Sequence, residues 1–138
     1  MGQILAIDYG KARCGIAATD DMQIIASGLE TVENRFLLEF LKKYFNENKV
    51  DEVVIGLPID LKGNVSEVEI DILKFIEEFK KEFSDIAVHR FDERFTSKMA
   101  SFFISQSGKN KKKRQEKGLI DKVSATIILQ NFLEQRLR

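Results

Sequence analysis

The first part of the chain consists of short apolar blocks separated by turns. Residues 4–20 begin with four apolar residues, reach Asp8, turn through Gly10 and return as a second apolar block that closes on Asp20. Two apolar blocks around a glycine-containing turn predict a β-hairpin. Residues 23–32 follow with a further short block, which we expect to be a third strand.

Helical periodicity begins after residue 33. Apolar residues recur every three to four positions over residues 34–48, after Ser66, after Thr96 or Ser97, and over residues 119–137, so we expect four helices. Ser66 with Glu69 three residues later has the form of a capping box at the start of the second helix. For the last helix the expected core face consists of Ile120, Val123, Ile127, Phe132 and Leu133.

Two short apolar runs lie between these helices. Residues 51–57 and 86–91 predict two further strands, the first ending at the only proline, Pro58. Three hairpin-linked strands followed by two helical crossovers imply an α/β fold with a mixed sheet, three antiparallel strands and then two parallel ones, flanked by helices. Because no linker or repeat interrupts the pattern, we expect a single domain over residues 1–138.

Composition excludes several classes of site. Lysine and arginine total 22, as do aspartate and glutamate, so the formal net charge is zero and the chain is not uniformly cationic. One cysteine, Cys14, excludes an internal disulfide and a multi-cysteine metal site. One histidine, His89, excludes a His-rich zinc centre, and we expect it on the surface of the last strand without a chemical role. The absence of a long apolar run or a signal pattern predicts a cytoplasmic protein without a membrane partner.

Three carboxylates stand at the ends of predicted elements. Asp8 ends the first strand, Glu93 follows the last strand, and Asp121 lies in the first turn of the final helix. With the first strand central, the ends of the first and fifth strands meet at the edge where open α/β sheets place ligands. Three oxygen donors suit Mg²⁺ or Mn²⁺, and such a site can hold a metal pair that activates water for phosphodiester cleavage.

Structural interpretations of the same acidic residues remain open at this point. Asp8 can cap its strand, Glu93 can pair with Arg90 or Arg94, and Asp121 can interact only with the helix dipole. Asp92 is an alternative ligand to Glu93, because side chains alternate at a strand end and the register is not fixed by sequence.

Four motifs resemble those of the YqgF/RuvX family, known as Holliday junction resolvases or pre-16S rRNA nucleases. The first is DYGKARCGIA, starting at Asp8 and followed by Asp20; the others are GLP from Gly56, DERFTS from Asp92, and Ile120-Asp121 followed by Ser124-Ala125. The likeness covers nearly the whole chain in order and spacing. Phe95 stands where the family usually has leucine, and Ser124 where it usually has alanine.

The resemblance implies a ribonuclease H-like fold in which Asp8, Glu93 and Asp121 bind the catalytic metal. The implied activity is a metal-dependent nuclease with Mg²⁺ or Mn²⁺, acting on structured nucleic acid. Maturation of the 5′ end of 16S rRNA precursor is favoured over resolution of branched DNA junctions, with the assembling ribosome as a further partner. A monomer or weak homodimer is expected.

Basic and polar residues near the motifs are candidates for nucleic-acid contacts. The densest basic segment, residues 109–117, can bind backbone phosphates or can simply be a solvated loop. Ser66 is a further polar candidate beside the expected groove. The full set of candidate contacts comprises Lys11, Arg13, Asn64, Arg94, Lys109, Lys111, Lys112, Lys113 and Arg114.

Two other functional classes fit parts of the sequence. The Asp-x-Gly turn also opens actin-like ATPases and sugar kinases, but those need two such domains to enclose ATP. A non-catalytic nucleic-acid-binding module would keep the fold without turnover, although retention of all three carboxylates argues against it.

Overall fold

The computed structural model describes residues 2–93 and 117–136, and for residues 117–121 the backbone alone. The helix expected after Thr96 and the basic segment 109–117, apart from the backbone of Lys117, lie outside the described residues. No helix in the described ranges is long and apolar enough to cross a membrane.

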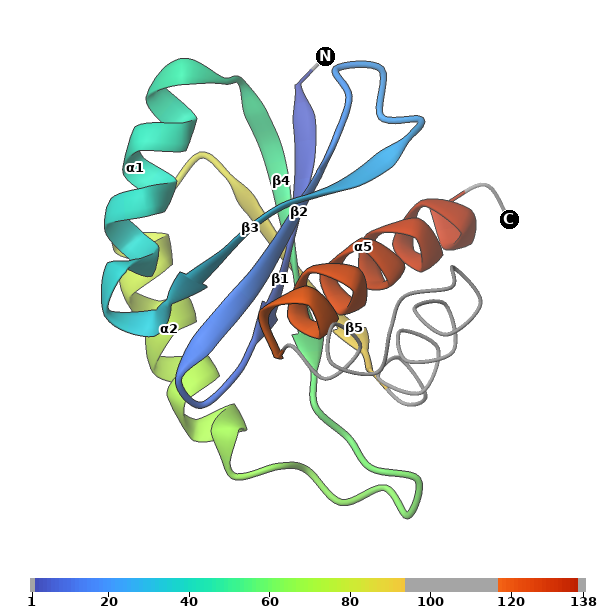
Figure 1. Ribbon diagram of the computed structural model, residues 1–138. Coiled ribbons are helices and arrows are strands. Elements are labelled where there is room, and N and C mark those ends of the chain that lie inside the picture. Colours follow the sequence, from blue (N-terminus) through green and yellow to red (C-terminus); the bar gives the residue numbers. More distant parts are fainter. Residues whose placement is uncertain (1, 94–116, 137–138) are drawn as a thin grey trace.

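A five-stranded mixed sheet forms the centre of the molecule, in the order β3-β2-β1-β4-β5 (Figure 1). β1 pairs antiparallel with β2 and parallel with β4, β2 pairs antiparallel with β3, and β4 pairs parallel with β5. The mixed topology predicted from the sequence is therefore confirmed. The strands are β1 (Gln3–Tyr9), β2 (Arg13–Thr19), β3 (Ala26–Glu33), β4 (Val50–Leu57) and β5 (Ala87–Asp92).

Helices cover both faces of this sheet (Figure 1). A 3₁₀ turn, η1 (Asn34–Phe36), leads into α1 (Leu37–Glu47), which lies with α2 (Val68–Glu82) on one face. Their apolar sides enclose strand residues such as Leu5 and Ile55. The last helix, α5 (Lys117–Arg136), covers the other face, where it packs on Ile4, Ala6 and Val54. Alternate strand residues thus enter two separate cores, as the period of two in a strand requires.

The start of α2 differs from the sequence prediction. Ser66 Oγ accepts only a long hydrogen bond, 3.4 Å, from the Val68 N–H, and Glu69 does not complete a capping box. Its carboxylate instead accepts two hydrogen bonds from the Arg90 guanidinium of β5, at 2.9 and 2.6 Å. A charge-assisted bidentate pair is stronger than a neutral cap, so the tertiary contact prevails over the local motif.

The core face of α5 was only partly predicted. Ile127 and Phe132 are buried as expected and Leu133 is partly buried, but Val123 is only half-buried. Three residues absent from the prediction, Ala125, Ile128 and Leu129, are fully buried. The helix contacts β1, β2, β3 and β4, so its buried surface is wider than one helical stripe.

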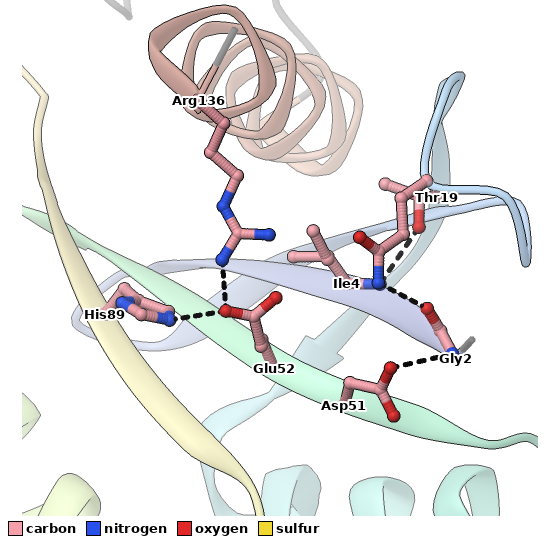
Figure 2. Close-up of polar contacts among 8 residues, drawn as sticks. Gly2, Ile4, Thr19, Asp51, Glu52, His89 and Arg136 are labelled. Carbon is pink, nitrogen blue, oxygen red and sulfur yellow. Dashed lines mark hydrogen bonds and ion pairs between the residues drawn. The ribbon is translucent and has the colours of Figure 1, made fainter.

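His89 takes part in a polar cluster beneath the end of α5 (Figure 2). Its Nε2 lies 2.8 Å from Glu52 Oε1, which also accepts a hydrogen bond from Arg136. The imidazole packs on Phe132, with ring centroids 5.3 Å apart. The side chain is 37% exposed, in keeping with the expected place at the strand surface, but the sequence did not indicate its contacts with Glu52 and Phe132. Arg136 and His89 hold the pKa of Glu52 below its usual value, so the cluster ties α5 to β4 and β5 as an ion pair.

Candidate active site

Asp8 lies near the carboxyl end of the central strand, on the face covered by α5. It follows Ile4 and Ala6 in the alternation that points into the α5 core. Across the hairpin it pairs with Gly15, which has no side chain to cover the carboxyl group. On the other side, Ile7 pairs with Ile55, so Gly56 of β4 comes next to Asp8 in the parallel register.

Glu93 reaches Asp8 because Gly56 leaves room for it. The Glu93 N–H donates to the Leu57 carbonyl at 3.0 Å, which extends the β4–β5 pairing to the residue after β5. A Cβ atom on Gly56 would lie 2.4 Å from Glu93 Cδ and 2.5 Å from its Cγ. The Glu93 side chain therefore crosses β4 over Gly56 and hydrogen-bonds to the Asp8 carboxyl group.

The two carboxyl groups share a proton. Burial raises the pKa of Glu93 to about 10, and the hydrogen bond to Asp8 and its negative charge act in the same direction. Burial also raises the pKa of Asp8, against the opposing effect of the Glu93 hydrogen bond. At neutral pH the pair therefore retains a proton, as expected for adjacent and largely desolvated carboxyl groups.

This pair suits a divalent cation. Buried carboxyl groups in hydrogen-bond contact must either share a proton or bind a cation. Both donors are oxygen atoms, which Mg²⁺ and Mn²⁺ prefer. Among the side chains the structure describes, no cluster of three or more His, Cys, Asp or Glu residues is suited to a metal ion.

The third predicted ligand, Asp121, belongs to the first turns of α5. The helix lies on the same face of the sheet as Asp8, but the side chain of Asp121 is outside the described set. Asp92, the alternative to Glu93, is one residue earlier and pairs with Leu57. By strand alternation it belongs to the opposite face, so Glu93 is the residue placed over Gly56.

The turn between β1 and β2 positions two predicted phosphate-binding residues. Lys11 is exposed at its tip, and Arg13 begins β2. Arg13 shares the face of Gly15 and therefore of Asp8. The turn is tight: the Gly10 N–H donates to the Arg13 carbonyl at 3.0 Å, and a Cβ on Gly10 would lie 2.6 Å from that oxygen.

Asn34, which is not among the residues predicted from the sequence, anchors this turn. Its Nδ2 donates to the Gly10 and Lys11 carbonyls at 2.8 and 3.0 Å. Its Oδ1 accepts from Cys14 Sγ at 3.1 Å. An asparagine at the end of a strand and the start of a helix is a recognisable capping residue, but its distant partners have no local sequence signal.

Arg90 fixes the end of β4 that carries Gly56. Besides its pair with Glu69, its guanidinium donates to the Ile55 and Gly56 carbonyls at 3.3 and 3.1 Å. Its charge opposes the rise in the pKa of Glu93, but its hydrogen bonds go to Glu69 and to these two carbonyls. Arg90 is therefore a support for the site, contrary to the pairing with Glu93 considered from sequence.

The loop after β4 forms an open pocket of about 320 Å³ beside Glu93. Asn64 and Ser66, both named from sequence as groove residues, line it. The remaining nucleic-acid candidates lie outside the described residues: Arg94, Lys109, Lys111, Lys112, Lys113 and Arg114.

Comparison with known proteins gives close relatives over the full chain. The chain is 50% identical over 137 residues to a Flavobacterium psychrophilum protein named "Putative pre-16S rRNA nuclease", covering 99% of this chain and 100% of that protein. A protein of the same name from Flavobacterium johnsoniae is 52% identical over 136 residues, covering 99% of each.

Solved structures agree on the fold. Thermus thermophilus RuvC in complex with a Holliday junction substrate superimposes with a TM-score of 0.58 at 14% identity, covering 99% of this chain and 96% of RuvC. A second structure of the same protein gives a TM-score of 0.56. The family model described as "RuvX: Holliday junction resolvase" matches residues 2–135. The chain therefore belongs to the RuvX family, as the four sequence motifs indicated.

Proposed function

We propose that this protein is a divalent-metal-dependent endonuclease that processes the 5′ end of 16S rRNA precursor. Membership of the RuvX family makes it a nuclease, which hydrolyses phosphodiester bonds. The observation that carries the metal-dependent mechanism is the hydrogen-bonded, half-buried carboxyl pair of Asp8 and Glu93, assembled over Gly56. The names of the Flavobacterium relatives support precursor 16S rRNA as the substrate.

In this proposal Asp8, Glu93 and Asp121 hold Mg²⁺ or Mn²⁺ in a two-metal site. Such ions activate a water molecule and stabilise the leaving oxygen of the phosphodiester. The chain itself keeps Asp8 and Glu93 in contact, and cation binding would displace the proton held between them. Arg90 holds the end of β4 in place beneath Glu93.

We assign the binding of substrate phosphates to basic residues near Asp8 and Glu93. Lys11 and Arg13 belong to the turn beside Asp8. Lys109, Lys111, Lys112, Lys113 and Arg114, with Arg94, are proposed to add backbone contacts that weaken with salt. We further propose a cytoplasmic single-domain enzyme, monomeric or weakly dimeric, that meets its RNA on the assembling ribosome.

Resolution of DNA junctions is the second candidate. The description of the matching family model favours it. A resolvase has to cut two strands, which requires two active sites related by symmetry. A non-catalytic binding module is the remaining alternative, and it predicts tight RNA binding without cleavage.

A side-by-side cleavage assay separates these candidates. Wild-type protein is incubated with Mn²⁺ and either precursor 16S rRNA fragments or a four-way DNA junction. The proposal predicts cleavage of the RNA at the mature 5′ end and an intact junction. Paired cuts in the junction would instead establish the resolvase, and RNA binding without any cleavage would establish the binding module.

A further inference from the structure

Of the described residues that line the pocket beside Glu93, only Glu93 is a proposed metal ligand. It lies between the end of β4 and the start of α2, and Glu93 forms one side of it. Pro58 and Ile59, both half-buried, and the exposed Val65 supply apolar surface. At about 320 Å³ it has the size of a small ligand site and can hold one nucleoside.

The loop that forms this pocket is held in shape by hydrogen bonds between its own residues. Ile59 and Val65 form an isolated antiparallel bridge, and the Asp60 N–H donates to the Asn64 carbonyl at 2.9 Å. Asp60 Oδ1 accepts from the Lys62 and Asn64 N–H groups at 2.9 and 2.8 Å. The pocket is thus formed before any substrate binds, which reduces the entropy cost of binding.

The described lining of the pocket favours a neutral occupant. Its exposed acidic residue is Asp60, and the described residues that line the pocket include no lysine or arginine. A phosphate placed there would meet the Asp60 carboxylate with no basic side chain among these residues. A neutral part of the substrate fits this lining better.

The polar groups of the pocket suit a nucleoside. The Asn64 side chain donates a hydrogen bond to the Asp60 carboxylate, which leaves the Asn64 amide oxygen able to accept one from a ligand. Ser66 Oγ accepts a long bond from the Val68 N–H and can donate its proton. One acceptor and one donor beside an apolar wall match the hydroxyl group of a ribose and the edge and face of a base.

We infer that this pocket binds the unpaired nucleoside next to the scissile phosphate of the RNA, with its base against Pro58, Ile59 and Val65 and its polar groups on Asn64 and Ser66. The inference rests on the proposed function, because Glu93 sets the position of the scissile phosphate. It makes the loop after β4 a specificity determinant that acts on the neutral part of a nucleotide, while the basic residues act on the backbone.

The test uses precursor RNA in which either nucleotide flanking the cleavage site is replaced by an abasic ribose. Wild type, the pocket variant Asn64→Ala/Val65→Ala and the control Leu61→Ala are compared. Leu61 is 56% exposed on the same loop but does not line the pocket. The abasic change at one flanking position should lower wild-type kcat/KM about tenfold, since it removes the apolar contact of one base.

The pocket variant should cleave intact RNA about tenfold more slowly than wild type and should lose nothing further on the abasic RNA. Leu61→Ala should behave as wild type. An equal abasic penalty in all three proteins, or no penalty at either flanking position in wild type, would overturn the inference.

Binding of the same RNAs in EDTA separates this inference from the proposed function. If wild type does not cleave, the function proposal fails, and fluorescence anisotropy still compares the two RNAs. Tighter binding of intact than abasic RNA by wild type, lost in the pocket variant only, would support the pocket. Equal affinities for the two RNAs, or no binding, would refute it.

Discussion

Replacing Glu93 by its neutral isostere should stabilise the metal-free protein at neutral pH. Glu93 is protonated in the folded state, where its pKa is about 10, but its ordinary pKa is 4.5. Below pH 4.5 both the folded and the unfolded chain keep the Glu93 proton, and the folded state has its full stability. Above pH 4.5 the unfolded chain releases this proton while the folded chain keeps it, so the free energy of unfolding falls as pH rises toward 10. Glu93→Gln keeps a hydrogen-bond donor to Asp8 but has no titrating proton, so its stability does not fall with pH in this way.

The magnitude follows from the pH interval. Each pH unit above the unfolded pKa costs about 1.4 kcal/mol, so wild type loses at most about 3 kcal/mol between pH 4.5 and pH 7. We expect the free energy of unfolding of Glu93→Gln to exceed that of wild type by about 1–3 kcal/mol at pH 7 and by under about 1 kcal/mol at pH 5. Urea denaturation in EDTA at several pH values measures this directly. Glu47→Gln, an exposed position on α1, is the matched control.

Parallel stability profiles for wild type and Glu93→Gln would refute the reasoning, as would a variant that is less stable at pH 7. Addition of Mn²⁺ gives an independent check. Because the cation replaces the shared proton, it should stabilise wild type in proportion to its binding and should leave the variant nearly unchanged.

Three further perturbations test individual parts of the site. Gly56→Ala should displace the Glu93 carboxyl group and lower cleavage about a hundredfold with little change in melting temperature, and near-normal cleavage would disprove the role of Gly56. Asn34→Ala should cost about 1–3 kcal/mol in urea denaturation, because two carbonyls of the β1–β2 turn lose their donor, and an unchanged midpoint would contradict that anchoring. Neutralising Lys111, Lys112 and Lys113 together should weaken RNA binding and flatten its salt dependence, whereas an unchanged salt slope would show that these lysines do not contact the RNA backbone.

The sequence predicted what depends on local pattern and chain order. Apolar blocks around Gly10 gave the hairpin, and two crossovers after it gave the parallel strands. Those two results are enough to bring the ends of β1 and β5 to one edge, where Asp8 and Glu93 meet. The role of Gly56 was not apparent, because the path of the Glu93 side chain depends on the space above a neighbouring strand.

What the sequence did not reveal depends on partners distant in the chain. Glu69 has a capping-box position but pairs with Arg90, which reaches it only after β5 is in the sheet. His89 packs on Phe132 but stays partly exposed, and this contact arises because α5 lies across four strands, which helical periodicity alone does not specify. Asn34 likewise acts on a turn more than twenty residues earlier.

The central claim is that Asp8 takes part in a metal-dependent nuclease site. The most direct measurement is Mn²⁺-dependent cleavage of precursor 16S rRNA by wild type, Asp8→Asn and Asp21→Asn. Asp21 is exposed in the turn between β2 and β3, at the opposite end of the hairpin. We expect cleavage by wild type and Asp21→Asn, and its loss in Asp8→Asn without a fall in melting temperature. Normal cleavage by folded Asp8→Asn would contradict it.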